Sequence, residues 1–117
     1  MAQQSNKEGP FVIGVDAGTE SLRAGVFDLK GNPLAFSSTA YQTTFPKPGW
    51  AEQNPQDWWE ALGKSVKNSI SEAGISSSAV ASICLDTTCC SVVALDGNGD
   101  PLRPCLIWMD LRSAPQT

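Results

Sequence analysis

Short apolar runs separated by turns fill the first part of the chain. Residues 11–16 read Phe-Val-Ile-Gly-Val-Asp, and apolar and polar residues alternate over 21–28. Both patterns are typical of β-strands. Residues 30–32, Lys-Gly-Asn, form a turn signal, and a less regular third strand is expected over 33–43. The sequence therefore predicts an antiparallel meander with a tight turn around Gly18.

The spacing of the apolar residues then changes, and the new spacing predicts one long helix. Asn54 suits the N-cap and Pro55 the first helical position, and the helix is expected to end at Ala73 because Gly74 is a good stop. The residues expected to face the core recur every four positions: Trp58, Leu62, Val66 and Ile70, with Trp59 widening the stripe.

More strand patterns follow the helix. We expect a strand over 80–86, a break over 87–90, a strand over 91–95 and a last short strand over 106–108, with a hairpin turn at 96–99. Strands before and after a single long helix indicate an α/β layer with a mixed sheet and a packing helix.

Composition and charge restrict the classes of protein to which the chain can belong. The chain has 117 residues, 41% hydrophobic content and a net charge of −4. It lacks a basic cluster, which argues against nucleic-acid binding, and has no apolar stretch of the length that crosses a membrane. Residues 1–10 are polar and read as a disordered lead-in without a signal peptide, so a cytoplasmic location is expected.

The four cysteines do not form a zinc-site pattern. Cys89 and Cys90 are adjacent, no Cys-x-x-Cys spacing occurs, and the chain has no histidine. We expect reduced, mostly buried thiols, with Cys84 in a strand and Cys105 near one.

The turn between the first two strands carries the candidate chemistry. A strand delivers Asp16 to Gly18, and the hydroxyl of Thr19 follows at once. Gly18 can take a positive φ and bring backbone N–H groups to an anion, and the Thr19 hydroxyl can donate to a phosphate oxygen. Asp16 would then hold Mg²⁺ or its water shell. A plain hairpin turn explains the same residues.

Four segments together resemble one family. Residues 12–24, VIGVDAGTESLRA, are similar to the N-terminal phosphate-binding segment of the FGGY carbohydrate kinases. The stretch PKPGWAEQNPQDW over 46–58, LDTTCCS over 85–91 and LIWMDLR over 106–112 follow in family order and spacing. The third segment resembles the ribulokinase-like members.

The resemblance implies an actin/sugar-kinase type of fold, related to ribonuclease H, with residues 11–117 as the N-terminal part of the first domain. It implies ATP-dependent phosphorylation of a small sugar, most readily a pentulose such as ribulose, then xylulose. ATP and Mg²⁺ are the implied cofactors, with Asp16 at Mg²⁺–ATP and Gly18, Thr19 and Arg23 near the phosphates. Glu20, where glycerol kinases carry Thr, is expected to point away.

The resemblance also places Thr88, Cys89 and Cys90 beside the sugar. The Arg-Glu pair of glycerol kinases is absent at Thr88 and Cys89, which disfavours glycerol. Asp110, with Arg112, either contacts the sugar or forms an ion pair that supports the cleft wall.

Length is the main departure from the family. Its members are several times longer, and their general base is an Asp in the part that follows. The 117 residues alone are therefore expected to be inactive, and homo-oligomer formation stays open. The alternative is a non-catalytic, actin-like interaction module or a truncated gene product.

Overall fold

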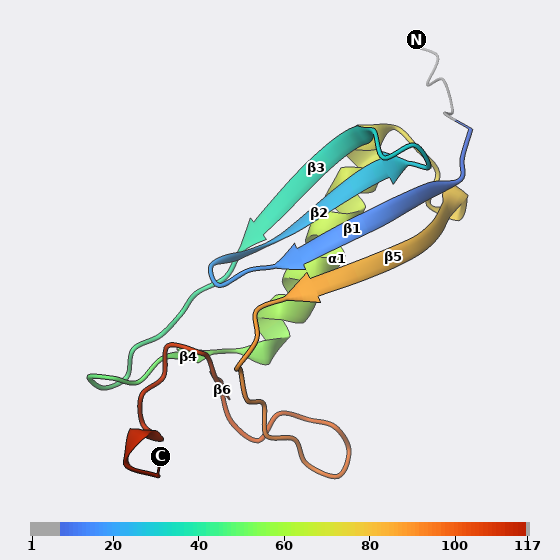
Figure 1. Ribbon diagram of the computed structural model, residues 1–117. Coiled ribbons are helices and arrows are strands. Elements are labelled where there is room, and N and C mark those ends of the chain that lie inside the picture. The colour runs from blue at the N-terminus through green and yellow to red at the C-terminus, as the bar shows by residue number, and fades with distance from the viewer. Residues whose placement is uncertain (1–7, 117) are drawn as a thin grey trace.

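A four-stranded mixed sheet forms the body of the molecule. The computed structural model describes residues 8–116, so most of the predicted lead-in, residues 1–7, lies outside the described part. The strand order is β3-β2-β1-β5 (Figure 1), with β1, β2 and β3 antiparallel and β5 parallel to β1. The strands are β1 (Phe11–Ala17), β2 (Ser21–Asp28), β3 (Pro33–Ala40) and β5 (Val80–Thr87). The predicted meander and mixed sheet are confirmed.

A second, two-stranded sheet lies beyond the end of the first. It pairs β4 (Glu52–Gln53) with β6 (Cys105–Leu106). The predicted strand over 91–95 does not form, because Val92 bridges Leu106 and Leu95 bridges Pro101 as isolated pairs instead of a ladder. Likewise β3 ends three residues earlier than expected, and the last strand is displaced from 106–108 to β6.

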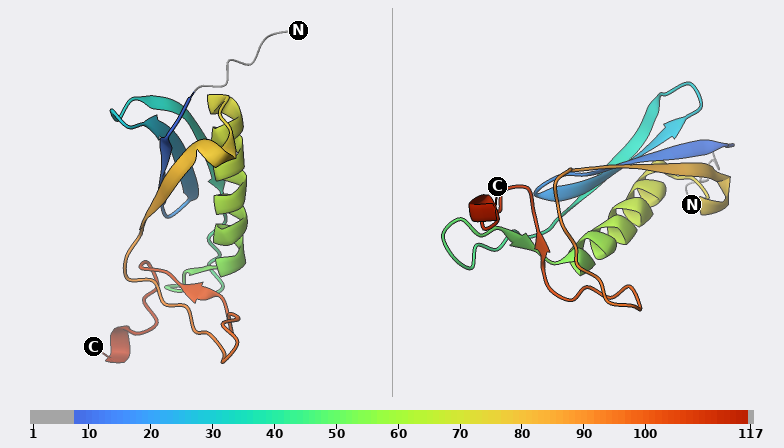
Figure 2. Two further views of the ribbon diagram at one scale, coloured as in Figure 1. Left: turned by 90° about the vertical axis from the view of Figure 1, so that its right-hand side faces the viewer. Right: turned by 60° about the horizontal axis from the view of Figure 1, so that its bottom comes forward.

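The helix α1 (Pro55–Ala73) begins and ends where the capping residues predict. The Asn54 side chain accepts a hydrogen bond from the Gln56 N–H at 3.1 Å, and Gly74 closes the helix in the left-handed region at φ 66°. The helix lies across one face of the sheet (Figure 2). Two short 3₁₀ turns, η1 (Ser77–Ala79) and η2 (Ala114–Gln116), complete the regular structure.

Small residues, and not the predicted bulky stripe, face the sheet from α1. The fully buried positions are Ala61, Ser65, Ser69 and Ala73. Their size lets the helix approach closely, and the Ser65 hydroxyl donates to the Thr39 hydroxyl at 2.8 Å. Residues of the predicted bulky stripe such as Leu62 directly follow the buried small residues in sequence and are half-buried. Trp59 is 70% exposed.

The edge strand β5 is also more exposed than its composition suggests. α1 packs on β2 and β3, so in residues 8–116 it leaves the apolar side chains Ile83 and Leu85 largely uncovered. The prediction of buried thiols is wrong for Cys84 on this strand, as it is for the two adjacent cysteines after it. All four thiols are free, and Cys105 is buried.

Two separate apolar clusters result. The larger lies between the sheet and α1 and includes Ile13, Val15 and Leu22. The smaller comprises Ala51, Cys105 and Ile107, under the two-stranded sheet, with Trp58 packed against it. No helix among the described residues has the length and hydropathy of a membrane span.

Candidate functional site

The predicted cofactor residues meet at the tip of the β1–β2 hairpin. Asp16 and Arg23 stand opposite each other in the antiparallel register, and Arg23 Nη2 donates to Asp16 Oδ2 at 2.5 Å. Ile13 and Val15 point toward α1, so the alternation of the strand places Asp16 on the opposite face. The Arg23 side chain is two-thirds exposed and the Asp16 side chain about half exposed, so a ligand can reach both. Asp86 lies beside Asp16 in the parallel register with β5.

The close approach of the backbone, and not a positive φ, favours glycine at position 18. Gly18 is not among the residues in the left-handed region, so that expectation is wrong. Its N–H donates to the Ser21 carbonyl at 3.0 Å and closes the turn. A Cβ at Gly18 would stand 3.3 Å from that oxygen, tighter than an ordinary contact.

Side chains from distant segments hold two of the carbonyls of this turn. The Tyr41 hydroxyl donates to the Gly18 carbonyl, and Gln53 Nε2 donates to the Thr19 carbonyl at 2.6 Å. A trans peptide points its N–H away from its C=O. The N–H groups of Thr19 and Glu20 therefore point away from Tyr41 and Gln53, and neither donates to an acceptor within residues 8–116. Two free backbone donors beside a hydroxyl suit an anion.

The Thr19 hydroxyl is oriented by a residue that the sequence analysis did not single out. Trp108 Nε1 donates to Thr19 Oγ1 at 3.1 Å. An indole N–H is a donor only, so Thr19 accepts this bond and keeps its own hydrogen for a ligand. Glu20 is exposed next to it.

Tyr41 stays a hydrogen-bond donor at neutral pH. Burial raises the pKa of its phenol, and the negative charge of Asp16 raises it further. The phenol therefore keeps the hydrogen that it donates to the Gly18 carbonyl over the physiological pH range.

A largely apolar pocket of about 430 Å³ opens beside the turn. Gly18, Trp58 and Leu85 line it, together with Thr88 from the loop after β5. The Thr88 N–H donates to the Ala17 carbonyl at 3.2 Å and fixes the start of that loop against β1.

The other predicted sugar contacts lie outside this lining. Cys89 and Cys90 are exposed on the loop, with their sulfurs 3.7 Å apart, and Cys90 takes a left-handed φ of 57°. The neighbouring Ser91 does line the pocket, and its hydroxyl is buried without a hydrogen-bond partner in the described chain.

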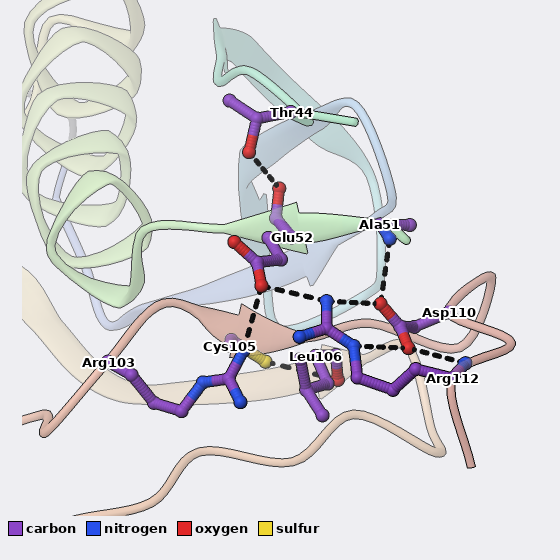
Figure 3. A network of polar contacts seen from close by, with 8 residues as sticks. All are labelled: Thr44, Ala51, Glu52, Arg103, Cys105, Leu106, Asp110 and Arg112. Atoms are coloured by element: carbon purple, nitrogen blue, oxygen red, sulfur yellow. Dashed lines mark hydrogen bonds and ion pairs between the residues drawn. The ribbon is translucent and has the colours of Figure 1, made fainter. Parts of the chain in front are cut away.

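Asp110 belongs to a network of ion pairs at the two-stranded sheet (Figure 3). Arg112 binds it through Nε and Nη2, at 2.8 and 2.7 Å, and the Ala51 N–H donates to the same carboxylate at 2.8 Å. Glu52 joins Arg112 to Arg103, each at 2.7 Å. The Asp110 side chain is 4% exposed. Of the two interpretations of this residue, the structure contains the ion pair.

The network stabilises the ionised form of Asp110. Hydrogen bonds from Arg112 hold the pKa of Asp110 well below its usual range, against the opposing effect of burial. The Arg112 guanidinium also lies over the Trp50 ring, 3.7 Å from its centre. These contacts join the segment before α1 to the end of the chain.

Comparison with known proteins agrees with this arrangement. The model of the FGGY family of carbohydrate kinases, N-terminal domain, matches residues 11–117. The chain belongs to this family. Its fold is accordingly that of the sugar-kinase N-terminal domain, in the actin-like class. A crystal structure of xylulose kinase from Rhodospirillum rubrum superposes with a TM-score of 0.84 and 31% identity, over 91% of this chain and 22% of that one.

Curated relatives include two kinds of kinase. A xylulose kinase of Streptomyces rubiginosus is 37% identical over 112 residues, covering 96% of this chain and 22% of the relative. A glycerol kinase of Thermococcus gammatolerans is 31% identical over 104 residues, covering 89% and 21%. The chain thus spans about a fifth of the length of these FGGY kinases.

The donor set at the turn fits a metal-bound phosphate better than a metal held by protein alone. No group of three or more His, Cys, Asp or Glu side chains gathers anywhere in residues 8–116. Mg²⁺ usually keeps several waters and takes only one or two carboxylates besides phosphate oxygens. Asp16 matches that requirement.

Proposed function

We propose that this chain forms the phosphate-binding part of an ATP-dependent kinase that phosphorylates a pentulose hydroxyl. The observation that carries the proposal is the turn at 18–20. Its carbonyls are held by Tyr41 and Gln53, and its free N–H groups and the Thr19 hydroxyl present a set of donors. Such donors stabilise the charge that spreads over a transferring phosphoryl group.

Asp16 and Arg23 complete the proposed nucleotide site. Asp16 would hold Mg²⁺, which neutralises phosphate charge when bound. Arg23 pairs with Asp16 in the structure and can turn toward a phosphate oxygen, because its side chain is 66% exposed. Gly18 keeps the backbone close enough for the amides to reach the anion.

The sugar would occupy the pocket beside Thr88. Thr88 lines this pocket, and Cys89 and Cys90 follow it on the exposed loop at its edge, where small side chains would leave room for a pentulose such as ribulose or xylulose. A thiol is only a weak hydrogen-bond partner. Shape would then dominate selectivity here. Asp110 has its oxygens occupied by Arg112 and Ala51, so we infer that it supports the wall of the site from behind.

Asp16→Asn tests the nucleotide site in a kinase polypeptide that carries this segment. Loss of one preorganised charged contact should lower kcat by roughly 100-fold, with the melting temperature and sugar KM preserved. Asp100→Asn, in an exposed loop, is the matched control. A coupled ADP-release assay reports both. Unchanged kcat in Asp16→Asn would refute the assignment.

Residues 1–117 by themselves should show no turnover. The general base that the family places further along is not among them. The same ADP-release assay with ribulose, xylulose and glycerol measures this, and activity clearly above a buffer blank would contradict the expectation.

Cys89→Leu tests the sugar side in the same polypeptide. Cys89 is exposed on the loop next to the pocket, so a leucine there adds bulk of one or two methylenes at the proposed sugar entrance and should raise the sugar KM by about 10-fold, with the ATP KM little changed. A lower melting temperature with an unaltered sugar KM would remove this loop from the site.

A further inference from the structure

Gln53 connects the proposed phosphate turn to the rest of the fold. It lies on β4, directly before α1, and is 4% exposed. We propose that Gln53 is a positioning residue that holds residues 18–20 in the conformation that binds an anion. The inference rests on the proposed function, because it assigns a role toward that same turn.

The carboxamide of Gln53 has one possible orientation. Trp58 Nε1 donates to Gln53 Oε1 at 2.9 Å, and an indole N–H cannot accept a bond. The end of the amide that faces Trp58 must therefore be the oxygen. The opposite end is the amino group, whose two hydrogens reach the Thr19 carbonyl at 2.6 Å and the Thr43 hydroxyl at 2.7 Å.

This orientation determines where the turn directs its donors. With its oxygen held by Gln53, the peptide after Thr19 must point the Glu20 N–H to the other side. Tyr41 holds the Gly18 carbonyl in the same way and so directs the Thr19 N–H. Without the Gln53 donor, the peptide between Thr19 and Glu20 could rotate, and the Glu20 N–H would no longer point toward the anion.

A purely structural role would look different. Gln53 also binds Thr43, so it could simply hold the segment after β3 against β4. Thr43→Val removes that bond and keeps the one to the Thr19 carbonyl. Gln53→Met keeps the length of the side chain and removes both bonds, together with the acceptor of the Trp58 indole. Comparing the two variants separates support of the segment from positioning of the turn.

The experiment is a titration of the 117-residue protein with Mg²⁺–ATP, followed by the backbone amide resonances of Thr19 and Glu20 in NMR spectra. The wild type should show ligand-dependent shifts at both amides. Gln53→Met should weaken the dissociation constant by about 10-fold, the size expected for one lost hydrogen bond. Thr43→Val should stay within about twofold of the wild type, as expected for a bond not shared with the turn.

Gln53→Glu provides a second variant if Gln53→Met does not fold. It can still accept from Trp58 but cannot donate to Thr19. Its carboxylate would be buried, where salt screens it weakly, and it would repel ATP, so this variant is measured without ligand. The amide resonances of Thr19 and Glu20 should move or broaden relative to the wild type if the turn loses its conformation. Unchanged resonances in the folded variant would count against the positioning role.

The outcomes distinguish the two proposals. No shift at Thr19 and Glu20 in the wild type would overturn the phosphate site itself. Wild-type shifts with an unchanged dissociation constant in the folded Gln53 variant would overturn the positioning role alone. Equal weakening in Thr43→Val and Gln53→Met would also overturn it, since the segment and not the turn would then be responsible.

Discussion

Removing the Glu52 carboxylate should destabilise the protein by about 3 kcal/mol, because charge-assisted hydrogen bonds contribute about 1.5–3 kcal/mol each. Glu52 is 8% exposed and accepts from Arg103 and Arg112, each at 2.7 Å. Arg103 is 43% exposed, so its bond counts near the surface value of about 0–1 kcal/mol. Arg112 is 15% exposed and supplies most of the effect. Backbone pairing between Thr44 and Glu52 is unaffected in Glu52→Ala.

Urea unfolding followed by tryptophan fluorescence measures this change in free energy, because Trp50 lies under the Arg112 guanidinium in the same part of the fold. Glu60→Ala is the control, since Glu60 is exposed and receives a single 3.5 Å contact from Gln56. It should stay within about 0.5 kcal/mol of the wild type. Equal effects of the two substitutions would refute the reasoning.

Four further substitutions test the packing and the electrostatics. Gly63→Ala should stabilise α1 by up to about 1 kcal/mol, because the added Cβ meets open space. Gly25→Ala should destabilise the sheet, because the added Cβ would stand 2.6 Å from the Phe36 ring. Thermal melts of the two variants compare these effects. Ser65→Leu should cost about 1–3 kcal/mol by forcing α1 off the sheet, measured by urea unfolding. Ionised Asp110 stabilises the fold above its unfolded pKa of about 3.9, so stability should fall as pH drops below it, and Asp110→Asn should flatten that acid limb in pH-dependent melts.

Local signals predicted the elements well. Asn54, Pro55 and Gly74 set both ends of α1 because capping depends on residues within a few positions. Alternation likewise found β1 and β2, whose partner is next in sequence. The turn and the pairing of Asp16 with Arg23 follow from that hairpin.

Contacts between distant segments were not predictable in this way. Gln53 reaches Thr19 across 34 positions and Trp108 reaches it across 89, and no local pattern reports either bond. The helix face was misjudged because hydrophobicity alone favours Leu62 over Ser65, although only a small side chain allows close approach to the sheet.

The two separate apolar clusters imply two cooperative units of different stability. The smaller buries only Ala51, Cys105 and Ile107, so it should open without unfolding of the main sheet. Amide hydrogens that close this unit, such as that of Val92 bonded to the Leu106 carbonyl, should exchange with solvent before those of β1. Because β4 belongs to this less stable unit, each such opening would also release the hydrogen bond from Gln53 to the β1–β2 turn.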